Sequence, residues 1–210
     1  MGAVLTPEAT ERPATSDLEA LVIRLGPLKH HLTDDEFFEF CQLNRDLRIE
    51  MTSEGEMIIM LPVGSEGGGR NFNLAVEFGV WAKADGTGKG FDSSTGFTLP
   101  NGAKRAPDLS WIRLDRWNAI PKKQQKKFAP ICPDFVVELR SESDALEPLQ
   151  AKMAEYLANG AQLGWLIDPL ERKVYIYRPQ TPVECLEDPG QVSGEPLLPG
   201  FVLEMREVWE

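Results

Sequence analysis

Three charged residues placed inside apolar segments constrain this chain more than any other feature. Residues 105–112 (RAPDLSWI) are predicted to form one strand with a single carboxylate, Asp108. Residues 133–140 (PDFVVELR) are predicted to form a second strand that carries Glu138, and the helix that follows holds Lys152 within its apolar stripe. Charges in buried segments are costly unless they are paired, hydrogen-bonded or metal-bound. Two acids and a base on consecutive elements therefore indicate a shared site.

Length and composition set the class of protein. The 210 residues suit one α/β domain, which we expect over residues 18–210 after a flexible tail at residues 1–17. No apolar run approaches the ~18 residues that span a membrane. The net charge of −11 argues against the broad basic surface of a non-specific nucleic-acid binder. A polyanionic partner would have to meet a local basic patch or bound cations.

The cysteines and histidines bear on the cellular compartment and on the kinds of catalytic or metal site that the chain could form. The three cysteines, Cys41, Cys132 and Cys185, are widely separated and odd in number, which favours a reducing, cytoplasmic compartment. The two histidines are the adjacent pair His30 and His31, so there is little material for Ser-His-Asp catalysis or for a His-rich metal site.

Cap and turn residues predict the remaining elements. Thr33, followed by three acids, opens a helix, and a turn at residues 52–55 joins two short strands as a hairpin. The consecutive glycines at 67–69 lack the Lys-Ser/Thr that would complete a P-loop, so they are predicted to form a flexible bend. The helix predicted after this bend is apolar nearly all round, which indicates that it is deeply packed. The predicted ranges are a bend at 64–69, a helix at 70–84, a strand and turn at 88–99, and a strand hairpin at 163–167 and 173–177.

Side-chain periodicity predicts where the charges point. Alternation along a strand puts Glu138 and Arg140 on one face, and helical spacing puts Lys152 on the buried stripe beside Met153. If the strand of Asp108 is the neighbour of the strand of Glu138, the two carboxylates converge on one hard divalent cation, Mg²⁺ or Mn²⁺. Such a cation polarises a phosphodiester and activates water, while the ammonium orients the nucleophile and offsets developing charge.

Structural explanations for each residue stay open at this point. Asp108, which follows a proline, could cap a turn. Glu138 could form a buried ion pair with Arg140 or Lys152, and Lys152 could extend its ammonium to water. A glycosidase with Asp108 and Glu138 as paired acids is also chemically possible, but it leaves Lys152 without a role.

The order of these segments resembles a known family. A proline-aspartate followed by a strand with E-x-basic is similar to the PD-(D/E)XK nuclease superfamily, which has the restriction-endonuclease-like fold. Closer still, five stretches in the same order resemble the Uma-type putative restriction endonuclease family over roughly residues 33–208: RIEMTSEGEMIIMLPVGSE, FDSSTGFTLPNGAKRAPDLSWI, CPDFVVELRSESD, KMAEYLANGAQLGWLIDP and LPGFVLE. The resemblance implies an α/β fold with a central mixed β-sheet flanked by helices, extended by an N-terminal helix and β-hairpin.

The resemblance also implies residue roles. Asp108 is the first acid and metal ligand, Glu138 the second, and Lys152 matches a lysine supplied from the following helix. Where E-x-K would place lysine, this chain has Arg140, which is always protonated and is retained as a candidate phosphate contact.

Weaker candidates surround these three. Glu50, Glu66 and Asp92 are each candidates for an additional acid at the metal site, whereas Asp134 is expected to start a strand and face solvent. Four lysines in one loop either form a solvated surface or contact the DNA backbone: Lys122, Lys123, Lys126 and Lys127.

The sequence thus predicts a metal-dependent endonuclease that hydrolyses DNA with Mg²⁺ or Mn²⁺. The alternative is a catalytically inactive nuclease fold that binds nucleic acid or protein. A homodimer is expected because cutting both strands of a duplex often uses two copies.

Overall fold

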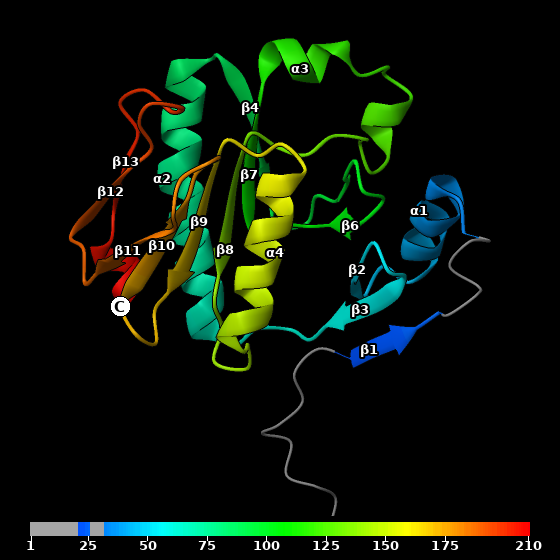
Figure 1. Cartoon of the computed structure of the whole chain (residues 1–210), viewed down its shortest axis with the longest axis horizontal. Coiled ribbons are helices and arrows are strands. Elements are labelled where there is room, and N and C mark those ends of the chain that lie inside the picture. The colour runs from blue at the N-terminus through cyan, green and yellow to red at the C-terminus, as the bar shows by residue number, and fades with distance from the viewer. Residues whose placement is uncertain (1–20, 26–31) are drawn as a thin grey trace, which may run out of the picture.

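A six-stranded sheet forms the centre of the computed structural model, which describes residues 21–25 and 32–210 (Figure 1). Its strands are β4 (Gly88–Asp92), β7 (Leu109–Arg113), β8 (Phe135–Leu139), β9 (Leu163–Asp168), β10 (Lys173–Tyr177) and β11 (Glu184–Glu187). They lie in the order β11-β10-β9-β8-β7-β4. β8 and β9 pair in parallel and the other neighbours pair antiparallel, so the sheet is mixed. The expected tail at residues 1–17 and the His30-His31 pair lie outside the described residues.

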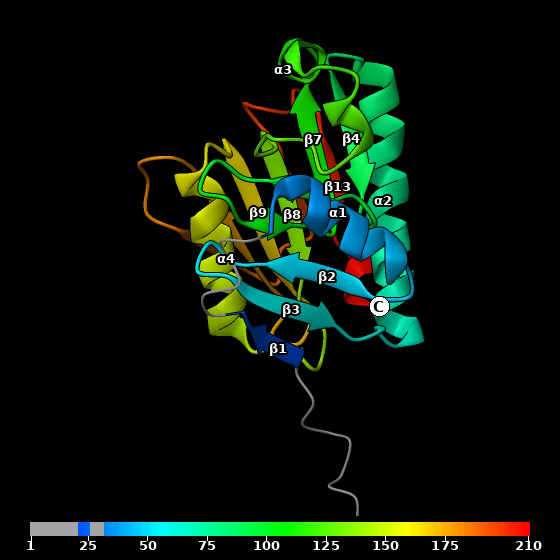
Figure 2. The same ribbon diagram turned by 90° about the vertical axis from the view of Figure 1, so that its right-hand side faces the viewer.

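Two long helices cover opposite faces of this sheet. α2 (Ser65–Asp85) packs Leu74 and Phe78 on the face that carries Val137, whereas α4 (Leu146–Ala158) packs Met153 and Tyr156 on the face that carries Val136. Figure 2 shows the sheet between the two helices. Because strand side chains alternate, Glu138 points to the same side as Val136, toward α4.

A second, five-stranded sheet is built mostly from the N-terminal part of the chain. Its strands are β1 (Leu21–Arg24), β2 (Arg48–Met51), β3 (Glu56–Met60), β5 (Phe97–Thr98) and β6 (Lys104–Arg105), in the order β1-β3-β2-β6-β5. α1 (Asp34–Leu43) packs Phe37 on the face that carries Ile49 and Met51. The opposite face carries Arg48 and Glu50, which alternate with those apolar residues.

Short elements complete the described chain. They are α3 (Leu114–Ala119), a 3₁₀ turn η3 (Gln124–Lys126), the paired strands β12 (Gln191–Ser193) and β13 (Val202–Glu204), and α5 (Arg206–Trp209). Within the described ranges, every helix is too short or too polar to cross a bilayer. All three cysteines are free thiols.

Several local predictions are confirmed. Thr33 caps α1 in a capping box: its Oγ1 accepts from the Glu36 backbone N–H, and the Glu36 carboxylate accepts from the Thr33 backbone N–H at 2.8 Å. β2 and β3 form the expected hairpin, as do β9 and β10. The predicted fold class, a mixed sheet flanked by helices, is also confirmed.

The prediction for residues 64–84 is wrong in two respects. Gly64 is the extended N-cap of α2 and residues 65–69 are helical, so the glycines begin the helix instead of forming a bend. Helices gain most of their stability from tertiary packing, which here outweighs the low helix propensity of glycine. The helix is also packed on one side only, because Phe72 and Val80 are 67% and 68% exposed.

The single strand predicted over residues 105–112 is in fact two strands in two sheets. β6 ends at Arg105 and belongs to the five-stranded sheet, and β7 begins at Leu109 in the six-stranded sheet. Pro107 lies between them and has no N–H to donate to a β-ladder. The chain crosses from one sheet to the other at this point, and Asp108 lies in the bend before β7.

Candidate functional site

The three residues singled out first in the sequence line one small cavity. Asp108, Glu138 and Lys152 border a volume of about 100 Å³ at the C-terminal end of β8. They come from the bend before β7, from β8 and from α4, respectively. Segments up to 44 positions apart in sequence are thus brought together by the packing of α4 on the sheet and by the antiparallel pairing of β7 with β8.

Glu138 and Lys152 form a buried ion pair. The Lys152 Nζ lies 2.9 Å from the Glu138 Oε1, and the Tyr156 hydroxyl donates to that same oxygen at 2.9 Å. Lys152 and Tyr156 are four residues apart on α4, so the helix turns both side chains toward β8. The other Glu138 oxygen has no hydrogen bond among the described residues.

Glu50 of β2 is the third acid of the cluster. Its Oε1 lies 2.9 Å from the Lys152 Nζ and accepts from the Ala106 backbone N–H at 2.8 Å. Its Oε2 accepts from the Arg105 guanidinium at 3.1 Å, and Arg105 also bonds Glu155 of α4 at 2.6 Å. The five-stranded sheet therefore supplies a second buried carboxylate that pairs with Lys152.

Asp108 is held beside the end of β8. Its Oδ2 accepts from the Leu139 backbone N–H at 2.9 Å, and its Oδ1 accepts from Arg48 Nη1 at 3.1 Å. The register pairs Leu109 with Val137, which brings the bend that holds Asp108 alongside residues 138 and 139. Its side chain is 13% exposed, so it forms part of the cavity wall and is not buried beneath it.

Burial is the main influence on the charges of the cluster. Burial, together with nearby Asp108 and Glu50, raises the pKa of Glu138 to about 7 although Lys152 opposes the shift. Burial alone would lower the pKa of Lys152, but Glu138 and Glu50 outweigh it and leave that pKa raised. For Glu50 the burial effect is outweighed by Lys152 and Arg105, so its pKa is lowered. Lys152 is therefore an ammonium at neutral pH.

The arrangement fits a hard cation held by few protein ligands. Nowhere in residues 21–25 and 32–210 do three or more His, Cys, Asp or Glu side chains form a group able to hold a metal ion. Mg²⁺ needs no such cage, since it is commonly bound by one or two carboxylates and completes its shell with water and phosphate oxygens. Asp108 and Glu138 border one cavity, and the raised pKa of Glu138 indicates a place where added positive charge is favourable.

The weaker acid candidates are placed differently. Glu66 is 62% exposed and pairs with Arg70 one turn along α2. It borders a surface cleft of about 680 Å³ whose wall also includes Asp108. Asp92 caps the turn after β4, where its Oδ1 accepts from the backbone N–H and hydroxyl of Ser94. Of the three additional acid candidates, Glu50 alone contacts the cluster of Glu138 and Lys152.

Arg140 does not pair with Glu138, although the two side chains were predicted to share a strand face. β8 ends at Leu139. Arg140 bonds Asp168 at 2.7 Å and the Asp144 carbonyl at 3.0 Å. Its guanidinium still lines the cleft that reaches Asp108.

The lysine run lies away from this cleft. Residues 122–127 follow α3, which continues from the C-terminal end of β7, whereas Asp108 precedes the N-terminal end of that strand. Five strand residues separate the two ends by about 17 Å. Figure 1 shows α3 at one end of the sheet and the start of α2, which borders the cleft, at the other. Lys127 pairs with Asp35 of α1 at 2.7 Å.

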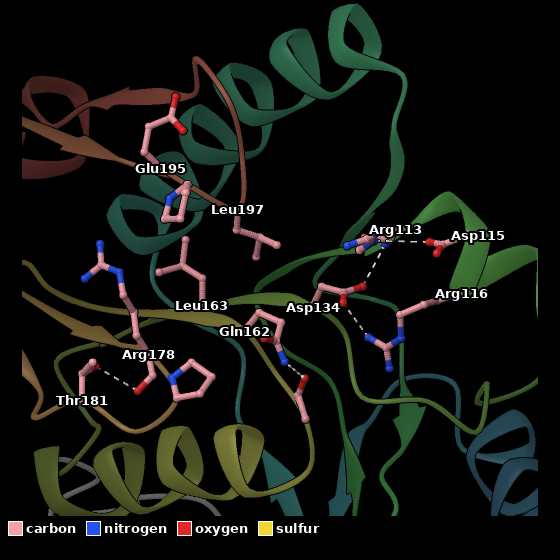
Figure 3. A pocket seen from close by; sticks show the side chains of 13 residues that line it. Arg113, Asp115, Arg116, Asp134, Gln162, Leu163, Arg178, Thr181, Glu195 and Leu197 are labelled. Carbon is pink, nitrogen blue, oxygen red and sulfur yellow. Dashed lines mark hydrogen bonds and ion pairs between the residues drawn. The ribbon is translucent and has the colours of Figure 1, made fainter.

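A second cavity, of about 870 Å³, lies at the α3 end of the sheet (Figure 3). Asp134 was expected to face solvent but is 2% exposed in the wall of this cavity. Its carboxylate accepts from the Arg113 backbone N–H at 2.9 Å and pairs with Arg116 at 2.7 Å (Figure 3). The prediction failed because the cation that pairs with Asp134, Arg116, is brought to it by α3.

Two residues of the cluster were missed in the sequence. Arg48 bonds Asp108, and Arg105 bonds Glu50. The alternation of side chains along β2 could have revealed Arg48. Ile49 and Met51 face the core under α1, so Arg48 and Glu50 lie together on the opposite face of the strand. Arg105 carried no such signal, since its strand has only two residues.

Comparisons with known proteins agree with this architecture. The sequence model of a family described as "Uma2: Putative restriction endonuclease" matches residues 34–206. The fold is similar to that in the crystal structure of a putative nuclease belonging to DUF820 from Anabaena variabilis ATCC 29413, with a TM-score of 0.67. That match has 23% identity and covers 85% of this chain and 97% of the other, so it supports the fold alone. A comparison with curated proteins found no match.

Proposed function

The chain belongs to the Uma2 family of putative restriction endonucleases, and from that premise we propose that it hydrolyses phosphodiester bonds of DNA as a metal-dependent endonuclease. The observation that carries the proposal is the convergence of Asp108, Glu138 and Lys152 on one cavity. Two acids and a lysine at the end of a central strand are the groups that such hydrolysis needs. Asp108 comes from the bend before β7 and Glu138 from β8, so their meeting is a property of the fold.

In this proposal Asp108 and Glu138 hold Mg²⁺ or Mn²⁺. When bound, the cation supplies Lewis-acid polarisation of a phosphate oxygen and a lowered pKa for bound water. The chain's own task is to fix the two carboxylates. Asp108 is fixed by the Leu139 backbone N–H, and Glu138 is fixed by the Tyr156 hydroxyl.

Lys152 acts in this proposal as a hydrogen-bond donor and electrostatic stabiliser. Its raised pKa keeps the side chain protonated near neutral pH, which disfavours a role as general base in the metal-free protein. An ammonium beside the cavity orients the attacking water and offsets the negative charge that develops on the phosphoryl group. Glu50, which contacts Lys152 and not the cavity, is a positioning residue.

The proposal is tested by plasmid nicking and linearisation in Mg²⁺ or Mn²⁺, with Glu138→Gln and Lys152→Met as the variants. Both substitutions are close in size to the native side chain. Glu171→Gln serves as a matched control, because that carboxylate lies on the exposed β9–β10 turn. We expect chelator and either site variant to abolish cleavage and the control to retain it.

Two outcomes would contradict this function. Cleavage that survives both variants would place the chemistry elsewhere. A folded wild-type protein that binds DNA in a gel-shift assay but never cleaves it would favour the alternative, an inactive nuclease fold that serves as a binding module. The homodimer expected from the sequence stays a prediction, and sedimentation of the purified chain tests it.

A further inference from the structure

A surface cleft leads from solvent to Asp108 and is lined by three arginines. It has a volume of about 680 Å³, and Asp108 forms part of its wall. Arg48 enters from β2, Arg70 from the second turn of α2, and Arg140 from the residue after β8. These three elements are far apart in the sequence, and the packing of the two sheets and α2 brings their cations to one cleft.

Arg48 is the arginine closest to the proposed reaction centre. Its Nη1 donates to the Asp108 Oδ1 at 3.1 Å and its Nη2 donates to the Ala106 carbonyl. The Nε–H is buried and has no acceptor within the described chain. The guanidinium is thus fixed against Asp108 with donor capacity to spare, while a third of the side chain is exposed to the cleft.

Arg70 and Arg140 line the same cleft as Arg48. Arg70 bonds Glu66, which is itself largely exposed, and the Arg70 Nε–H is buried without an acceptor in residues 21–25 and 32–210. Arg140 is anchored by the buried Asp168, which fixes its orientation at the cleft. A guanidinium has five N–H donors in a planar fork that matches two oxygens of a phosphate.

The three arginines are the cations among the residues that line the cleft. The net charge of the chain is −11, and the other charged residues that line the cleft are acidic: Asp46, Glu66, Asp108 and Glu142. A polyanion is repelled by such carboxylates, so a phosphate is held in the cleft only where a guanidinium reaches it. Because the arginines border the cleft that reaches Asp108, they are better placed than the lysines beyond α3 to bring a phosphate to that residue.

We propose that Arg48, Arg70 and Arg140 form the phosphate-binding wall of the site. The DNA backbone lies along the cleft, with Arg48 against the phosphate nearest Asp108 and the other two arginines on phosphates further along the same strand. This inference rests on the proposed function, because it names how the same site holds its substrate. It places the principal DNA contacts at the cleft and not at Lys122, Lys123, Lys126 and Lys127.

DNA binding measured without cleavage tests the inference. Fluorescence anisotropy of a labelled duplex in chelator, repeated over a range of salt concentrations, reports both affinity and the number of phosphate contacts. We expect Arg70→Gln and Arg48→Gln each to weaken binding about tenfold and to reduce the slope of log K against log salt by about one. Arg172→Gln is the matched control, since this exposed arginine lies on the β9–β10 turn.

Arg70→Gln keeps the test decisive if Arg48→Gln, which removes the partner of Asp108, fails to fold. Unchanged affinity and slope in folded cleft variants would overturn the inference. So would a loss of binding in the Lys122→Ala/Lys126→Ala double variant without a loss in the arginine variants.

The inference and the proposed function fail in different ways. Arginine-dependent binding without any cleavage would refute the endonuclease and leave the phosphate wall standing. Metal-dependent cleavage, together with DNA affinity that is unchanged in the arginine variants, would refute the phosphate-binding wall and leave the endonuclease proposal standing. A folded wild-type protein that neither binds nor cleaves DNA would overturn both.

Discussion

Replacing Glu138 by glutamine tests whether burial and the neighbouring carboxylates disfavour the charged form of Glu138 in the metal-free protein. Burial, with Asp108 and Glu50 nearby, raises the pKa of Glu138 from 4.5 to about 7. Between these two pH values the folded protein binds more protons at this position than the unfolded chain does. Protonated Glu138 therefore contributes stability that is complete below pH 4.5 and is lost as the pH rises through about 7.

The size of the effect follows from the same shift. One pKa unit corresponds to about 1.4 kcal/mol, so titration of Glu138 lowers the free energy of unfolding by about 2–3 kcal/mol between about pH 5 and pH 8. The side chain is 3% exposed, so solvent screening reduces this value little. Glutamine keeps the shape and an acceptor for the Tyr156 hydroxyl but does not titrate. We expect the stability of Glu138→Gln relative to wild type to improve by that amount over the interval.

Urea unfolding followed by tryptophan fluorescence, at several pH values between about 5 and 8 and in chelator, measures this difference. The difference between variant and wild type removes the contribution of the titrating groups that do not interact with Glu138. Glu171→Gln is the matched control, because that carboxylate is exposed on a turn away from the cluster. Parallel profiles for wild type and Glu138→Gln would refute the electrostatic reasoning, since they would mean that the folded site does not disfavour the charged carboxylate.

Three further predictions follow from the same contacts. Mn²⁺ at about 100 times its Kd should add about 2.7 kcal/mol to the stability of the wild type, measured as a rise in Tm that chelator reverses, and Asp108→Asn should remove the rise. Glu50→Gln should cost about 3–5 kcal/mol in urea unfolding, because it leaves Lys152 and Arg105 with one partner fewer in a buried cluster. A cost below about 1 kcal/mol would show that Glu50 holds neither cation. Asp134→Asn should lower the free energy of unfolding by about 1–3 kcal/mol and leave plasmid cleavage intact. A loss of cleavage in the folded variant would show that the α3 end of the sheet takes part in the reaction.

Local rules recovered much of the fold from the sequence. Thr33 and Glu36 marked the start of α1, and alternation along residues 135–139 put Glu138 on the strand face opposite to Val137. In the structure the face of Glu138 packs on α4. Helical spacing placed Lys152 on the inner side of α4. Each of these depends on neighbours within a few residues, and such interactions are nearly independent of the rest of the chain. Pro107 also carried a usable local signal, which the single predicted strand overlooked.

Local rules did not predict which distant elements contact each other. Periodicity says which face a side chain occupies but not which distant segment faces it. Glu50 meets Lys152 across 102 positions of sequence, and Arg48 meets Asp108 across 60. Asp134 was assigned to solvent because the arginine that neutralises it arrives on α3, a contact that its own neighbours do not reveal.

The sequence by itself determined the capped start of α1, the hairpins β2–β3 and β9–β10, the faces of β8 and α4, and the presence of two acids and a lysine in apolar surroundings. Only the tertiary structure decided that these residues share one cavity, that Glu50 holds Lys152 in place, and that arginines from three elements border the approach to Asp108. The physical reason is that long-range strand pairing and sheet packing depend on the whole chain at once, whereas capping, alternation and helical spacing act between residues a few positions apart.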